Sequence, residues 1–134
     1  MFEKYKIGVP EMDAQHARWI QLIENFKRLF SADEESDRRQ TETLSALRQL
    51  LDYTRSHFES EEKFLERHGY PKLIAHQQRH KELEQAVSRL HDTMQAGRMT
   101  LTQPKLNMLS IVWLMEHILK EDADYAKFLA NLTA

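Results

Sequence analysis

Cysteine is absent from this 134-residue chain, and glycine and proline are scarce, with three residues of each. The lack of cysteine excludes disulfides, thiolate metal sites and cysteine nucleophiles, so any metal must be held by histidine and carboxylate side chains. With so few residues that break helices, 41% apolar and 30% charged residues favour an all-α globular protein. The length is that of one domain, so we expect a single unit over residues 1–134.

The chain also lacks an excess of charge of one sign and any long apolar run. Nineteen basic residues stand against 21 acidic ones, so there is no basic surface for nucleic acid or for an anionic membrane. The first residues hold no apolar run of signal-peptide length, and no segment approaches the ~18 apolar residues that a membrane span requires. We therefore expect a cytoplasmic protein with no nucleic-acid or membrane partner.

Apolar residues recur in steps of three and four along four stretches of the chain. This period predicts helices over about residues 10–30, 38–67, 71–96 and 103–131. Pro10, Pro71 and Pro104 suit the first turns of three of these helices, and Gly69 suits the end of the second. Because the connections are short, we expect an up-down-up-down antiparallel four-helix bundle, preceded by an extended arm over residues 1–9.

The stretch from His57 to His80 carries two pairs of metal-type side chains at one-turn spacing, His57 with Glu61 and His76 with His80. Further histidines and one aspartate fall on the inward stripes of the other helices. The complete set of candidate ligands is His16, His57, Glu61, His76, His80, His117 and Asp122. A single inward histidine is more often a hydrogen-bonded core residue than a ligand. Five of them favour a metal site, because each unpaired buried polar group costs about 1–3 kcal/mol.

The step from His117 to Asp122 is five residues, which an ideal α-helix turns by about 140° beyond one full circle. The stripe then resumes in steps of three and four through Tyr125. We therefore predict a local π-type widening between His117 and Asp122, a feature that tends to occur at functional sites. The other two histidines, His68 and His91, are predicted to be surface residues.

Seven ligands exceed the needs of one tetrahedral zinc ion and suit two metal ions, although imidazole alone does not choose between iron, zinc, copper and nickel. If both carboxylates bridge and one solvent-derived bridge is added, the donors fall one short of filling two six-coordinate ions. One position would then be open to a small molecule. No histidine has a glutamate three residues before it, which argues against the ferritin-like diiron oxidases and their Glu-x-x-His motifs.

Four segments give the chain a resemblance to the hemerythrin family, in particular to bacterial single-domain hemerythrins. They are DAQH ending at His16, HFESE from His57 to Glu61, YPKLIAHQQRH with His76 and His80, and WLMEHILKEDADY with His117 and Asp122. The resemblance implies two iron ions with an oxo or hydroxo bridge, and Glu61 and Asp122 as bridging carboxylates. It places one iron on His76, His80 and His117. The other iron, on His16 and His57, keeps the open position, where dioxygen binds.

We further expect a pocket for the gas, lined by residues one or two turns from the ligands: Ile20, Ile23, Phe58, Leu109 and Trp113. The expected function is reversible dioxygen binding for storage, delivery or buffering, by a monomeric protein that is not an enzyme. Two alternatives stay open at this point. One is oxygen or redox sensing through a partner protein, and the other is diiron oxidase, peroxidase or nitric-oxide scavenging activity.

Overall fold

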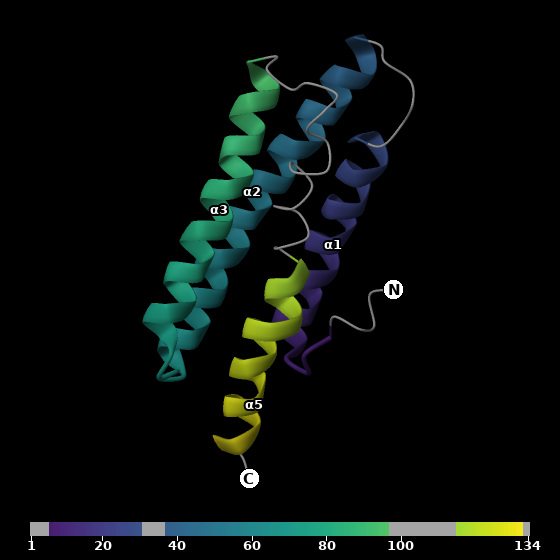
Figure 1. Ribbon diagram of the computed structural model, residues 1–134. Helices are drawn as coiled ribbons and strands as arrows, with labels where there is room; N and C mark the ends of the chain where they lie inside the picture. Colours follow the sequence, from purple (N-terminus) through teal and green to yellow (C-terminus); the bar gives the residue numbers. More distant parts are fainter. Residues whose placement is uncertain (1–5, 31–36, 97–114, 133–134) are drawn as a thin grey trace.

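The computed structural model describes residues 6–30, 37–96 and 115–132, and these residues form an all-α bundle (Figure 1). The helices are α1 (Pro10–Phe30), α2 (Asp37–Arg67), α3 (Leu73–Gln95), the π-helical segment η2 (Ile118–Asp122) and α5 (Ala123–Leu132). No strand occurs in these three segments. Successive helices run in alternating directions, and residues 115–117, η2 and α5 form the described part of the fourth (Figure 1). The predicted fold class is confirmed. The expected start of the fourth helix near residue 103 lies outside the described residues.

Asp13 anchors the described end of the N-terminal arm to the first turn of α1. Its Oδ1 accepts a hydrogen bond from the amide of Ile7 at 2.8 Å, and its Oδ2 accepts one from Gly8 at 3.1 Å. Gly8 has a φ of 86°, which a side chain would disfavour. Ile7 and Val9 consequently pack against an apolar cluster that includes Met12 and Tyr125.

The α2–α3 connection is a tight reversal that closes on Gly69. The amide of Gly69 donates to the carbonyl of Glu66 at 3.1 Å, and the amide of Tyr70 donates to the carbonyl of Leu65 at 3.0 Å. These two bonds, with Gly69 at φ +66°, form a Schellman motif. The prediction that α3 starts at Pro71 was wrong by two residues. Residues 71–72 form a turn, and the helix begins at Leu73, whose amide donates to the carbonyl of Tyr70 at 3.2 Å.

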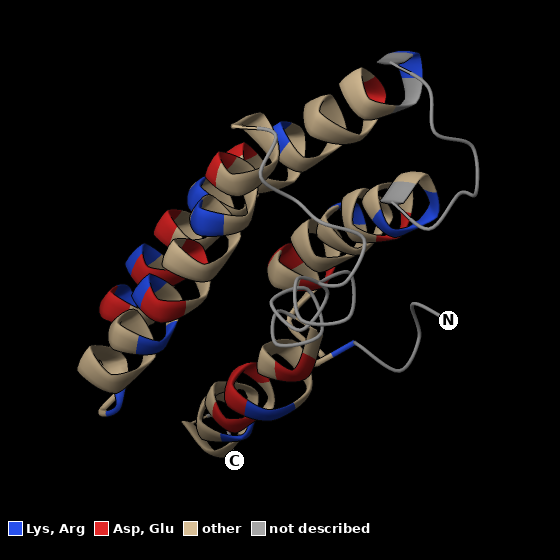
Figure 2. Ribbon diagram, turned by 45° about the horizontal axis from the view of Figure 1, so that its top comes forward, with Lys and Arg blue, Asp and Glu red and all other residues tan. Residues whose placement is uncertain are grey.

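Two apolar clusters fill the bundle, and the candidate ligands lie between them. The larger cluster includes Trp19, Phe26 and Phe58, and the smaller is built around Met12, Phe64, Leu65, Tyr70 and Tyr125. Along α1 the order is Met12, His16, Trp19, so the histidine separates the clusters. Charged residues of both signs mix along the outer faces of the helices (Figure 2). The buried candidate ligands are thus enclosed between two layers of apolar side chains.

The two remaining histidines differ in burial. His68 is exposed, as predicted. The prediction for His91 was wrong, because this side chain is only 5% exposed. His91 lies one helical turn after Val87 on the inward side of α3, and the periodicity of that helix therefore buries it.

Candidate metal centre

The fourth helix widens where the sequence predicted it. Residues Ile118–Asp122 form a π-helical segment, in which backbone bonds span five residues instead of four. His117 and Asp122, five residues apart, therefore both face inward, and both are 0% exposed. The predicted π-type widening is confirmed. Without this extra residue in the turn, one of the two side chains would point away from the bundle axis.

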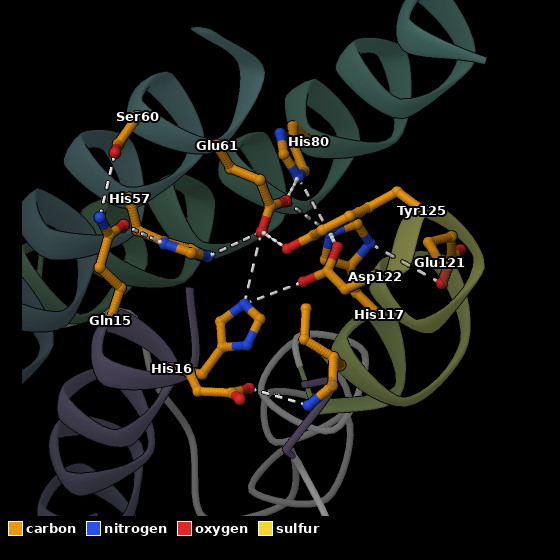
Figure 3. Close-up of polar contacts among 12 residues, drawn as sticks. Gln15, His16, His57, Ser60, Glu61, His80, His117, Glu121, Asp122 and Tyr125 are labelled. Atoms are coloured by element: carbon orange, nitrogen blue, oxygen red, sulfur yellow. Dashed lines mark hydrogen bonds and ion pairs between the residues drawn. The ribbon is translucent and has the colours of Figure 1, made fainter. Parts of the chain in front are cut away.

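The bundle brings all seven candidate ligands together from α1, α2, α3 and the fourth helix. Figure 3 labels each of them except His76. They form two overlapping groups whose donor atoms lie within 4.8 Å of one another. One group is Glu61, His76, His80, His117 and Asp122, and the other is His16, His57, Glu61 and Asp122. Glu61 and Asp122 belong to both groups. Every member is buried, with an exposed fraction of 4% or less.

Glu61 presents one carboxylate oxygen to each group of histidines. Its Oε1 lies 2.8 Å from Nε2 of His76 and 3.0 Å from Nε2 of His80. Its Oε2 lies 3.3 Å from Nε2 of His57 and 3.4 Å from Nε2 of His16. This is the placement that a carboxylate bridging two cations requires.

Asp122 repeats this arrangement from the opposite side of the site. Its Oδ1 lies 2.9 Å from Nε2 of His117 and 3.1 Å from Nε2 of His76. Its Oδ2 lies 3.0 Å from Nε2 of His16. The two carboxylates together thus connect the two histidine groups.

Side chains outside the cluster fix the protonation of the outer ring nitrogens. Nδ1 of His80 lies 2.9 Å from a carboxylate oxygen of Glu62, which can only accept the hydrogen bond. Nδ1 of His57 lies 2.7 Å from Oε1 of Gln15, whose amide nitrogen donates to Oγ of Ser60 at 3.0 Å. Both imidazoles therefore carry their proton on Nδ1 when neutral, and their Nε2 lone pairs face the cluster.

On the inward side of the site, acceptor atoms consequently outnumber the available donors. Nε2 of His80 lies 2.9 Å from Nε2 of His117. Nε2 of His16 and of His57, and both oxygens of Asp122, lack a hydrogen bond of acceptable geometry to any described residue. Such buried lone pairs repel one another unless a cation lies between them. The donor set therefore fits metal ions held by imidazole and carboxylate.

Protons can partly replace such cations, and the pKa values reflect this. Burial by itself lowers the pKa of His16 and His76, but the adjacent carboxylates of Asp122 and Glu61 outweigh it and raise the pKa of both to about 9. The same balance raises the pKa of His117 to about 10. Burial raises the pKa of Glu61, yet its imidazole partners hold it well below the usual range. The site is thus strongly attractive to positive charge.

Comparison with known proteins identifies the family. A model described as the Hemerythrin HHE cation binding domain matches residues 7–129, a range that contains all seven residues of the cluster. The chain belongs to the hemerythrin family. The expected family resemblance is thereby confirmed.

Several relatives of this hemerythrin chain carry the name Bacteriohemerythrin. The one from Stenotrophomonas maltophilia is 33% identical over 120 residues, covering 90% of this chain and 74% of the relative. The one from Pseudomonas aeruginosa is 30% identical over 118 residues, covering 88% and 72%. The one from Clostridium acetobutylicum is 24% identical over 127 residues and covers 92% of this chain and 95% of the relative. The similarity therefore extends over most of each protein.

Aromatic side chains line the hemerythrin site toward the larger apolar cluster. Phe58 stacks on the ring of His80, with centroids 3.7 Å apart and planes within 2°. The ring centroid of Trp19 lies 5.0 Å from that of His57 and 5.4 Å from that of Phe58. The indole N–H of Trp19 donates to the hydroxyl oxygen of Thr54 at 2.9 Å. Of the predicted pocket residues, Phe58 thus contacts the site directly.

The other predicted pocket residues fall into two classes. Ile20 and Ile23 are buried in the same apolar cluster as Trp19 and Phe58, with exposed fractions of 5% and 0%. Leu109 and Trp113 lie outside the described residues.

Among the helices that the structure describes, none is both long and apolar enough to cross a membrane.

Several described residues that contact the cluster were not assigned to the site from the sequence, although Tyr125 was placed on the inward stripe. Gln15, Glu62 and Glu121 are each the immediate neighbour of a candidate ligand, and Tyr125 lies one turn after Asp122. The hydroxyl of Tyr125 donates to Oε2 of Glu61 at 3.0 Å. Sequence adjacency was the only signal for the first three, because it places them on the flanks of the ligand stripe.

Proposed function

We propose that this protein binds dioxygen reversibly at a non-heme diiron centre and serves in oxygen storage, delivery or buffering. The observation that carries this proposal is the orientation of Glu61 and Asp122, each of which directs one oxygen to either histidine group. Carboxylates placed in this way could hold two ions close together, and a pair of iron ions would supply the electrons that reversible oxygen binding requires. The similarity to proteins named Bacteriohemerythrin supports iron as the metal.

The two histidine groups would hold the two ions unequally. His76, His80 and His117 would complete one ion, and His16 and His57 the other, with an oxo or hydroxo bridge between the ions. His16 and His57 supply one imidazole fewer than the other group, so the ion that they would hold would be the one with room for dioxygen. Glu61 and Asp122 would serve both ions.

The surroundings of the site support binding of a small apolar molecule. Trp19 and Phe58 are 0% and 2% exposed and contact the rings of His57 and His80. Their role would be to exclude water, because water and protons that reach bound oxygen promote its irreversible loss. An apolar gas can enter such a layer at little cost, whereas ions cannot.

We also propose that the protein is not an enzyme, since the Glu-x-x-His motifs of the diiron oxidases are absent from its sequence. Sensing through a partner protein and catalytic scavenging stay as alternatives. The cytoplasmic location and the monomeric state stay predictions from the sequence.

The proposal is tested by metal content combined with oxygen uptake. The full chain is loaded with ferrous iron without oxygen, freed of excess metal, and titrated with dissolved oxygen in an oxygen-electrode cell. We expect two irons per chain, and one dioxygen taken up and returned when the cell is purged with argon. Uptake that is not returned, or that continues when a reductant is supplied, would favour an enzyme. Fewer than two irons per chain would contradict a diiron centre.

A further inference from the structure

Three histidines of the cluster have outer partners that differ in charge. His80 and His117 face carboxylates, with Nδ1 at 2.9 Å from Glu62 and at 3.7 Å from Glu121. His57 faces a neutral amide, with Nδ1 at 2.7 Å from Oε1 of Gln15. The anionic partners both belong to the group of His76, His80 and His117. In the group of His16 and His57, the partner among these three contacts is the neutral amide of Gln15.

The amide of Gln15 is held so that it cannot turn. Its nitrogen donates to Oγ of Ser60 at 3.0 Å, which keeps the carbonyl oxygen directed at His57 (Figure 3). The backbone carbonyl of Gln15 also accepts a hydrogen bond from the hydroxyl of Tyr53 at 3.1 Å. Gln15 therefore orients His57 without adding charge.

The two carboxylates are not equivalent to each other. Glu121 also pairs with Arg79 at 3.1 Å, so part of its charge is already balanced. Glu62 is closer to its imidazole and about a quarter exposed, at 26%. The strongest difference in outer charge is thus between Glu62, behind His80, and Gln15, behind His57.

We infer that Glu62 and Gln15 are positioning residues that make the two metal positions unequal, so that the ion on His76, His80 and His117 binds first and more tightly. This inference rests on the proposed diiron function. An imidazole that donates its outer N–H to a carboxylate is a stronger donor through its other nitrogen, and such outer partners typically change metal affinity about 10–100-fold. An amide orients the ring without this increase. The ion with the open position is then the last to bind and the first to leave.

The test is a titration of the metal-free full chain with Co²⁺ at one fixed pH, followed by calorimetry. Wild type should bind two ions in a tight and a weaker phase. His57→Ala should remove the weaker phase and His80→Ala the tight one, which assigns the phases. Glu62→Gln should weaken the tight phase about 10–100-fold and change the weaker phase only a few-fold. Gln15→Glu should tighten the weaker phase by a similar factor.

Gln15→Glu separates a positioning role from a merely structural one, because a substitution that only disturbed packing would not tighten binding. The Ser60 hydroxyl can donate to the new carboxylate, so the contact can persist. The matched control is Glu59→Gln, which makes the same charge change on α2 at a 69%-exposed side chain paired with Lys63 at 3.0 Å. Unfolding of each metal-free variant checks that it folds.

The outcomes distinguish the inference of unequal metal positions from the proposed two-metal site. A Glu62→Gln variant that weakens both phases equally, or neither, overturns the inference, as does a Gln15→Glu variant whose weaker phase is unchanged. The proposed two-metal site survives either result, provided that wild type binds two ions. Wild type that binds no second ion contradicts both claims.

Discussion

The hydroxyl of Tyr125 offers a direct test of how the buried carboxylate of Glu61 is stabilised. Tyr125 is 0% exposed and donates to Oε2 of Glu61 at 3.0 Å. Burial and the charges of Glu61 and Asp122 raise the pKa of Tyr125 far above its usual value, so the phenol keeps its proton and stays a donor. Tyr125→Phe removes this donor and preserves the ring, which packs 6.2 Å from Tyr70 and 5.7 Å from His76.

The expected loss follows from the charge of the acceptor. A hydrogen bond to a charged group contributes about 1.5–3 kcal/mol. Oε2 of Glu61 also lies 3.3–3.4 Å from two imidazoles, so it keeps partners after the substitution. We therefore expect Tyr125→Phe to lower the free energy of unfolding of the metal-free protein by about 2 kcal/mol. For a chain of this size that is a fall in Tm on the order of 6–10 °C.

The assay is urea denaturation of the metal-free chain, with Tyr53→Phe as the matched control. The Tyr53 hydroxyl donates to the neutral carbonyl of Gln15 at 3.1 Å in a partly buried position, so its loss should cost about 0.5–1.5 kcal/mol. Tyr125→Phe must be the more destabilising variant. Equal losses, or a loss for Tyr125→Phe below about 0.5 kcal/mol, would refute the view that this phenol stabilises a buried charge.

Further predictions concern pH, the second carboxylate and the α2–α3 turn. The folded pKa values of His16 and His76 are about 9 and that of His117 is about 10, above the ordinary 6.5, so their contribution is complete below pH 6.5 and is lost as pH rises through 9–10. The urea midpoint of the metal-free protein should fall over that range. Asp122→Asn should reduce binding from two metal ions to at most one, measured by metal analysis. Gly69→Ala, at φ +66°, should lower the free energy of unfolding by about 1–2 kcal/mol in urea titrations.

Each of these expectations has an outcome that contradicts it. A metal-free protein whose urea midpoint is flat or rises from pH 6.5 to 10 would show that the imidazoles are not held protonated. Two tightly bound ions in Asp122→Asn would remove this carboxylate from the bridging role. A Gly69→Ala variant as stable as wild type would mean that the turn relaxes to a negative φ.

The sequence predicted the fold class and the membership of the buried cluster because both depend on helical periodicity. Steps of three and four identify which side of a helix is buried. The five-residue step from His117 to Asp122 predicted the π-helical segment that the structure contains. The same reasoning failed where tertiary packing decides. Pro71 was expected to open α3, but the turn that closes on Gly69 extends through Lys72.

The outer partners could not be predicted, because they depend on how neighbouring helices are rotated and on side-chain rotamers. Gln15 meets His57 across the contact between α1 and α2, and Glu62 meets His80 across that between α2 and α3. Periodicity locates each residue on its own helix and gives no information on such contacts. The prediction for His91 failed for a simpler reason, because this residue was assigned to the polar side of its helix although it lies one turn after Val87 and is buried.

Reversible oxygen binding is tested most directly by the optical spectrum of the iron-loaded full chain through repeated cycles of oxygenation and argon purging. We predict a near-colourless reduced form, a coloured oxygenated form with visible absorption, and full return of the reduced spectrum in each cycle at two irons per chain. Absorption that appears once and does not reverse, at the same iron content and without added oxidant, would contradict reversible oxygen binding.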